Sequence, residues 1–195
     1  MQTFHNFVPQ KSVKLLECWI HQLDTDVVVS PPRKSKLGDF KFRHNRLVVS
    51  VNDNLNPYSF LITLTHELAH AFVYTKHKNT VKAHGVIWQR TFKYMMLKFL
   101  NPDCFPEDII KVLSVHLIKP KASSFSDLAL VEVLRKYNLN KSLTVVDIEE
   151  GEKFLLENGR GFVKGKKLRK RYRCIEEKTK KVYLFHPLSE VVRLQ

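Results

Sequence analysis

The sequence predicts an α+β fold, in which a helical core with a small antiparallel sheet precedes a small C-terminal β unit. Apolar residues recur at helical spacing through most of residues 1–120. Short runs rich in Val and Phe, separated by polar turns, dominate residues 143–195. The stretch 120–126 between them has the proline and serines that are typical of a linker. An apolar content of 44% is ordinary for a folded globular protein.

Helices account for most of the first part of the chain. Val13, Leu16 and Ile20 share one face of the first predicted helix. Asn56 and Pro57 supply the cap and the first-turn proline that favour the start of the second. The predicted helices span residues 9–23, 56–76, 85–100, 106–117 and 128–137.

Strands are predicted in two groups. The first group, at 27–29, 37–42 and 46–51, forms the small antiparallel sheet, with a polar turn at 43–45. The second group spans residues 143–146, 153–156, 161–163, 171–175 and 182–185. Turn-like breaks are expected at 158–159 and 164–165, and a hairpin loop at 177–180.

These elements divide the chain into three parts. Residues 1–120 form the helical domain, and residues 121–142 form a linker with a short helix. Residues 143–195 form a basic, β-rich unit. We therefore expect two folded parts joined by a connecting segment.

Several classes of protein are disfavoured by composition. No run of eighteen apolar residues occurs, so we expect no membrane span. The N-terminus lacks a charged leader followed by an apolar stretch, which argues against a secretory signal. Cys18, Cys104 and Cys174 are few, odd in number and far apart, so they indicate reduced thiols and neither a disulfide framework nor a C-x-x-C site. These observations predict a cytoplasmic protein, nucleoid-associated if the source is bacterial.

Positive charge is the second strong signal. The chain has 33 Lys and Arg against 19 Asp and Glu, a net charge of +14, which favours polyanionic partners. A smaller basic group lies at 33–36, and the main cluster lies between residues 159 and 181. Phe162, Tyr172, Tyr183 and Phe185 interleave with this cluster, either to stack on bases or to form the core of the β unit. The candidate nucleic-acid-binding residues are Lys164, Lys166, Lys167, Arg169, Lys170, Arg171 and Arg173.

The run His66-Glu67-Leu68-Ala69-His70 is the H-E-x-x-H pattern. Residues four apart share one face of a helix, so His66 and His70 can bind one Zn²⁺. Glu67 is then placed to act as general base on a zinc-bound water. A catalytic zinc takes three protein ligands and keeps one open position. The chain thus has two ligands and a base in one helical turn and requires a third ligand.

His84, fourteen residues beyond His70, is the preferred third ligand. The polar loop 77–83 can fold back over the first helix and deliver its imidazole to the same metal. His77 and His44 are the alternatives. His77 lies near the predicted end of the helix, and His44 lies in a hairpin turn, so both are weaker candidates.

On these residues the chain resembles the SprT-like zinc metalloproteases, the group that includes SprT and Spartan. The resemblance rests on the H-E-x-x-H run, on His84-Gly85-x-x-Trp88, and on the strand-rich stretch that ends at Leu55-Asn56-Pro57. It covers about residues 10–120 and implies a helical, zincin-like metalloprotease core. It also implies that His66, His70 and His84 hold zinc and that Glu67 is the base.

The best-characterised members of that family act on proteins cross-linked to DNA and are activated by DNA. The resemblance thus implies DNA as a partner and DNA-bound proteins as substrates. We expect the DNA to be single-stranded or damaged and the protein to be a monomer. Many members have a C-terminal zinc ribbon built from paired cysteines. Here Cys174 is the one cysteine in that region, so the β unit must be held by its own core.

Three functions are compatible with the sequence. The first is a zinc endopeptidase that acts on DNA-associated proteins. The second is a non-catalytic, zinc-containing, nucleic-acid-binding regulatory protein, against which the presence of Glu67 argues. The third is a peptidase with an unrelated protein substrate, whose basic unit binds an acidic partner.

Overall fold

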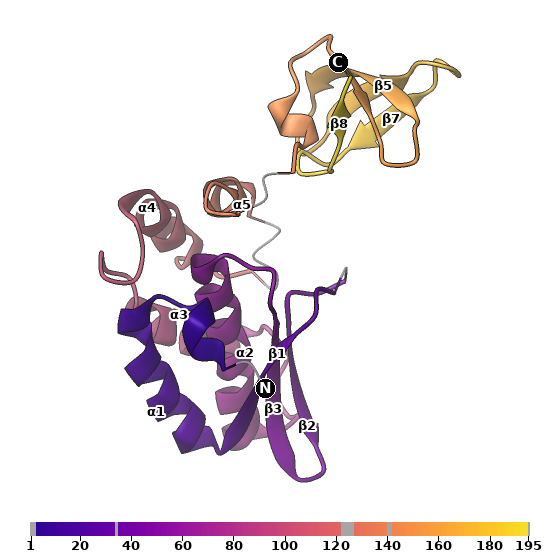
Figure 1. The fold of residues 1–195 in the computed structure, drawn as a ribbon. Coiled ribbons are helices and arrows are strands. Elements are labelled where there is room, and N and C mark those ends of the chain that lie inside the picture. Colours follow the sequence, from indigo (N-terminus) through magenta and orange to yellow (C-terminus); the bar gives the residue numbers. More distant parts are fainter. Residues whose placement is uncertain (1–2, 34, 122–126, 140–141, 195) are drawn as a thin grey trace. The chain divides into compact units, whose positions relative to one another are not determined.

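The computed structural model describes residues 3–33, 35–121, 127–139 and 142–194 (Figure 1). The fold is mixed α+β, with five α-helices and two sheets in these residues. The chain divides into two compact units, Met1–Leu139 and Asn140–Gln195, each with its own hydrophobic core. Most of the predicted linker, residues 122–126, lies outside the described residues. Within them, no helix combines the length and apolar character that crossing a bilayer requires.

Helix α2 is the central element of the first unit. It begins at Pro57, where the Asn56 side chain accepts a hydrogen bond from the Ser59 N–H at 2.9 Å. Residues on most of its faces are buried, because the other helices and the sheet surround it. The helices are α1 Val13–Leu23, α2 Pro57–His77, α3 Val86–Leu97, α4 Glu107–His116 and α5 Leu128–Arg135.

Helix α5, which was predicted within the connecting segment, packs into the first unit. Leu130 and Leu134 are buried in the same core as α2. The amide of Asn56 donates hydrogen bonds to the Leu134 carbonyl at 2.9 Å and to the Asn138 side chain at 2.6 Å. The residue that caps the central helix therefore also holds the end of α5.

The sheet of the first unit consists of β1 (Thr25–Ser30), β2 (Gly38–Arg43) and β3 (Arg46–Asn52), in the order β1-β3-β2. Strands β2 and β3 form the expected hairpin, with positive φ at both turn residues. The prediction of an antiparallel sheet is wrong for β1, which pairs with β3 in parallel. The last of the three strands in the sequence therefore lies in the middle of the sheet. That order cannot be read from the alternation of apolar residues.

The second unit is a five-stranded antiparallel sheet in the order β7-β6-β5-β4-β8. Its core includes Phe154 and Phe162, both fully buried. The strands are β4 Lys153–Leu155, β5 Gly161–Lys167, β6 Tyr172–Glu176, β7 Val182–Phe185 and β8 Val192–Arg193. No cysteine ribbon takes part, since Cys174 is a free, buried thiol.

Two local predictions in this unit are wrong, and one strand was missed. Residues 143–146 are not a strand, because Thr144 and Asp147 form a capping box around a short 3₁₀ turn. Residues 164–165 are not a turn but lie inside β5, at an irregular pairing with β6. Strand β8 is two residues long and gives no periodic signal.

Candidate metal centre

Three imidazoles converge between α2 and α3. His66 and His70 lie one turn apart on α2, and His84 lies just before α3 with a positive φ of 57°. The Nε2–Nε2 distances are 3.2 Å for His66–His70, 3.1 Å for His66–His84 and 2.9 Å for His70–His84. The loop between the helices thus brings the third histidine to the other two, and the group can hold a metal ion.

The Trp88 ring packs against all three imidazole rings. Its side chain is 1% exposed, and its ring centroid lies 4.5 Å from His66, 5.2 Å from His70 and 4.7 Å from His84. Phe92 stacks on its other side at 5.1 Å. The apolar stripe of α3 therefore has a second use besides core packing, because it limits how far each imidazole can rotate.

The imidazoles lie in an environment that favours their neutral form. Burial, reinforced by the neighbouring histidines, lowers the pKa of His66 to about 3. Burial and His84 lower the pKa of His70 to about 4, and burial also lowers that of His84. Neutral imidazole is the form that binds a metal. The site therefore presents three nitrogen lone pairs at neutral pH.

Glu67 lies on the side of α2 that faces strand β2. Its side chain is 8% exposed, and the Phe40 backbone N–H donates a hydrogen bond to its carboxylate. Burial, reinforced by the charge of Asp39, raises the pKa of Glu67 to about 8, against the opposing effects of Arg33 and Lys36. The carboxylate is thus a buried group with a fixed hydrogen-bond donor.

Gly38 allows β2 to approach α2 this closely. A Cβ atom at this position would lie 2.7 Å from the Thr63 Cγ2 atom and 2.8 Å from the Glu67 Oε1 atom. A larger residue would therefore have to displace either the strand or the carboxylate. The close approach of the strand to the helix depends on the absence of a side chain here.

A cavity of about 350 Å³ opens at the centre, between the histidines and β2. Because β2 is an edge strand, its free edge is not paired within the sheet. The residues that line the cavity are Lys36, Gly38, Asp39, Phe40, His66, Glu67, His70 and His84. The arrangement places three metal-binding nitrogens and one carboxylate around a space that a small part of another molecule can enter.

The two alternative third ligands lie elsewhere. His77 is the last residue of α2 and lines a different pocket, together with Trp19 of α1 and Tyr94 of α3. His44 lies in the β2–β3 turn. Neither belongs to the histidine group, which is the one such group found among the described residues.

Of the basic residues predicted to bind nucleic acid in the second unit, one is buried and six are exposed. Lys164 is 6% exposed, and its ammonium group donates to the Val146 and Ile148 carbonyls, so its prediction as a nucleic-acid contact is wrong. Lys164 shares the inward face of β5 with Phe162. The remaining candidates are exposed on and around the β5–β6 hairpin: Lys166, Lys167, Arg169, Lys170, Arg171 and Arg173.

The aromatic residues among these basic residues form the core of the unit. Phe162 and Tyr172 are buried, while Tyr183 and Phe185 are half-buried and pack against the same cluster. Of the two roles considered for them, core packing is confirmed. The exposed part of the basic cluster thus offers charge without aromatic rings for stacking.

The contribution of β2 to the centre was not predicted from the sequence. Gly38, Phe40, Asp39 and Lys36 all line the cavity, although none of them is a metal ligand. One signal was present, because a glycine at a strand position often marks a close approach of another element. What it approaches depends on strand order, which the local sequence does not contain.

No family model, curated protein or solved structure matches this chain.

Proposed function

We propose that the protein is a zinc-dependent endopeptidase of SprT type that acts on proteins bound or cross-linked to DNA. One observation carries this proposal. The Nε2 atoms of His66, His70 and His84 lie within 3.2 Å of one another, and the next residue after His66 is a buried carboxylate that faces the same cavity.

The ligand set fits zinc. Tetrahedral Zn–N bonds of about 2.0–2.1 Å place two ligand nitrogens about 3.3 Å apart. The observed separations of 2.9–3.2 Å need little adjustment to reach that value. Three histidines leave a fourth position free, which is the arrangement of a catalytic rather than a structural zinc.

The chain's own residues supply the rest of the chemistry. His66, His70 and His84 would hold the zinc, which would supply a Lewis acid for a carbonyl group and lower the pKa of a water molecule. The positive charge of the zinc would favour the ionised form of Glu67, which would then accept a proton from water and pass it to the leaving amine. The Phe40 N–H holds the Glu67 carboxylate in place during both transfers. Trp88 fixes the imidazoles, so the geometry is present before a substrate enters.

The DNA partner is supported by charge. Six basic side chains are exposed on and around the β5–β6 hairpin of the second unit, and the whole chain has a net charge of +14. Such a surface neutralises phosphates irrespective of base sequence. Since the aromatic rings are in the core, we expect contacts to the phosphate backbone rather than base stacking.

The deciding experiment is cleavage of a DNA-bound protein by the wild type and by Glu67→Gln in zinc-replete buffer, with and without single-stranded DNA. We expect DNA-stimulated cleavage that falls by at least about 10³-fold in Glu67→Gln, because the base is lost while the ligands remain. His77→Ala is the matched control, since this histidine lies outside the centre, and it should cleave as the wild type does.

Zinc content of each variant must be measured in parallel. Equal zinc in wild type and Glu67→Gln assigns the loss to the base. No cleavage by either protein, together with salt-dependent DNA binding, would contradict the proposal and favour the non-catalytic regulatory protein.

A further inference from the structure

The three-stranded sheet of the first unit has two different faces. Phe40 and Phe42 of β2 pack towards Tyr74 of α2, with ring centroids 5.6 Å and 5.1 Å apart. The alternate residues Asp39 and Lys41 must then point to the opposite side. We call this side the outer sheet face; its charged residues are Asp26, Arg33, Lys36, Asp39, Lys41, Arg43 and Arg46.

Helix α2 covers the inner face of the sheet, against both β2 and β3. On β3, Val49 and Val51 are fully buried on that side, whereas Ser50 between them is half-buried on the outer side. In Figure 1 the helices of this unit lie to one side of the three strands. The outer sheet face is therefore the side of the sheet that the unit's own core does not use.

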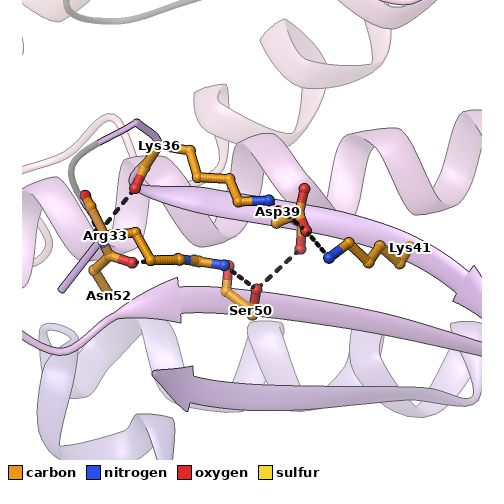
Figure 2. Close-up of polar contacts among 6 residues, drawn as sticks. All are labelled: Arg33, Lys36, Asp39, Lys41, Ser50 and Asn52. Atoms are coloured by element: carbon orange, nitrogen blue, oxygen red, sulfur yellow. Dashed lines mark hydrogen bonds and ion pairs between the residues drawn. The ribbon is translucent and has the colours of Figure 1, made fainter. Parts of the chain in front are cut away.

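Arg33 is fixed on the outer sheet face by neutral groups (Figure 2). Its Nε atom donates to the Asn52 side-chain oxygen at 2.8 Å, and its Nη1 atom donates to the Ser50 hydroxyl at 3.0 Å. The Asn52 amide in turn donates to the carbonyls of Arg33 and Lys36. No carboxylate pairs with Arg33 among the described residues, so its charge is oriented but not neutralised.

The lysines beside it are only partly neutralised. Lys36 and Lys41 approach the same Asp39 oxygen, at 2.9 Å and 2.8 Å. Burial acts to raise the pKa of Asp39, but the hydrogen bonds and charges of Lys41 and Lys36 lower it overall. Asp39 lies between the ammonium groups of Lys36 and Lys41, so these three side chains together have a net charge of +1 (Figure 2).

The positive charge continues along β2 to the hairpin. The Nη1 atom of Arg46 lies 3.5 Å from the Oδ2 atom of Asp26. Arg43 is exposed, and no carboxylate of the described residues pairs with it. The outer sheet face thus has five cationic side chains against two carboxylates. The six residues of β2 extend over roughly 17 Å, so the charges form a stripe rather than a point.

We infer that the outer sheet face is a second nucleic-acid contact, which binds the phosphate backbone next to the metal centre. A flat stripe of uncompensated charge suits an extended polyanion, and an oriented guanidinium is suited to the paired oxygens of a phosphate. Lys36 also lines the cavity of the centre, so the stripe begins where the substrate would be cut. This inference adds a DNA-binding surface to the proposed function and rests on that function for its biological role. The DNA binding itself is tested separately, because it is measured without cleavage.

The test uses the full-length Glu67→Gln protein, loaded with zinc, and the fluorescence anisotropy of a labelled single-stranded DNA over a range of salt concentrations. Lys41→Gln/Arg43→Gln should weaken binding about 3- to 10-fold and reduce the salt slope by about 1.4. Lys14→Gln/Lys111→Gln is the matched control, with the same loss of charge on α1 and α4, where both lysines are exposed. An equal effect of both pairs would overturn the inference.

Two further arms make the test specific. Asp39→Asn adds positive charge to the outer sheet face and should tighten binding about threefold, so unchanged or weaker binding counts against the inference. An RNA strand of the same sequence tells whether the backbone sugar matters. If polyglutamate competes as well as DNA at equal charge, and loses this ability in Lys41→Gln/Arg43→Gln, an acidic protein replaces nucleic acid as the occupant. The binding results stand whether or not the wild type cleaves protein.

Discussion

The two units bury polar side chains in different ways. In the second unit, Lys164 is satisfied by two backbone carbonyls, and Glu176 by Arg160 and Thr179. In the first unit, the nitrogen atoms of the half-buried histidines at the centre face one another instead. A group whose partners are all provided by the fold contributes to stability, whereas nitrogen atoms that converge on one another can hold a metal ion.

Burial alone does not separate the two cases, since Glu67 and Lys164 are exposed to similar extents, 8% and 6%. What separates them is whether the surroundings supply a complete set of partners. Substitutions at the converging group and at groups with a complete set of partners should therefore have different kinds of effect, on chemistry in the first case and on stability in the second.

The largest effect should come from disturbing the converging group through Gly38. Gly38→Ala places a methyl group 2.8 Å from the Glu67 Oε1 atom, which must move. We expect peptidase turnover to fall about 100-fold, because a shift of about 1 Å in a catalytic group costs that much. Turnover at saturating substrate and zinc content should be measured together. Normal zinc with normal turnover would mean that β2 does not position the carboxylate.

A smaller effect, on stability alone, should follow from Lys164→Met. The loss of the hydrogen bonds to the Val146 and Ile148 carbonyls leaves buried acceptors unpaired, at a cost of about 1–3 kcal/mol. We expect a lower unfolding midpoint for the second unit in urea, with DNA affinity within about twofold of the wild type. Lys166→Gln is the exposed counterpart and should show the reverse, with weaker DNA binding and an unchanged midpoint. If Lys164→Met loses as much DNA affinity as Lys166→Gln, the assignment of Lys164 to stability and of Lys166 to DNA binding is wrong.

The smallest effect concerns a satisfied pair within the first unit. Asp127 lies 2.9 Å from the buried His116, and although burial acts to raise the pKa of Asp127, the hydrogen bond and charge of His116, with Lys121, lower it overall. A carboxyl group with a lowered folded-state pKa stabilises the fold above its unfolded value of about 4, and this stability is lost as the pH falls through the folded value.

Asp127→Asn should therefore flatten the loss of stability on the acid side of about pH 4, at a cost of about 1 kcal/mol near neutral pH. Urea unfolding of the wild type and the variant across that range measures it. Zinc content and cleavage at neutral pH should stay unchanged. If the free energy of unfolding falls equally steeply with decreasing pH in both proteins, the Asp127–His116 pair is not the source of the acid-side loss of stability.

Local chemistry made some features predictable from the sequence. The helix starting at Asn56 and Pro57 was predicted because a cap and a proline act over a few residues. The spacing of His66 and His70 depends only on the helical repeat. That Lys164 points inward was also predictable in principle, since it alternates with Phe162 on a strand.

Other features depend on partners distant in sequence. The parallel pairing of β1 with β3 arises from the order of the strands, which the pattern of any single strand does not encode. The same holds for the contact of Gly38 with Glu67, twenty-nine residues later. Residues 143–146 were misassigned because valines favour strands, whereas the Thr144–Asp147 capping box fixes a tighter turn.

The amide of Asn56 has a consequence for how much of the chain must be present for the centre to form. This one side chain starts the helix that bears His66 and also holds the Leu134 carbonyl at the far end of the unit. Leu130 and Leu134 complete the core around that helix. A fragment that stops near residue 120 would lack Leu130 and Leu134, and the NH2 group of Asn56 would lose the hydrogen-bond acceptors of Leu134 and Asn138. The compact unit that contains His66, His70 and His84 therefore extends to Leu139, past the boundary at residue 120 that the sequence predicts.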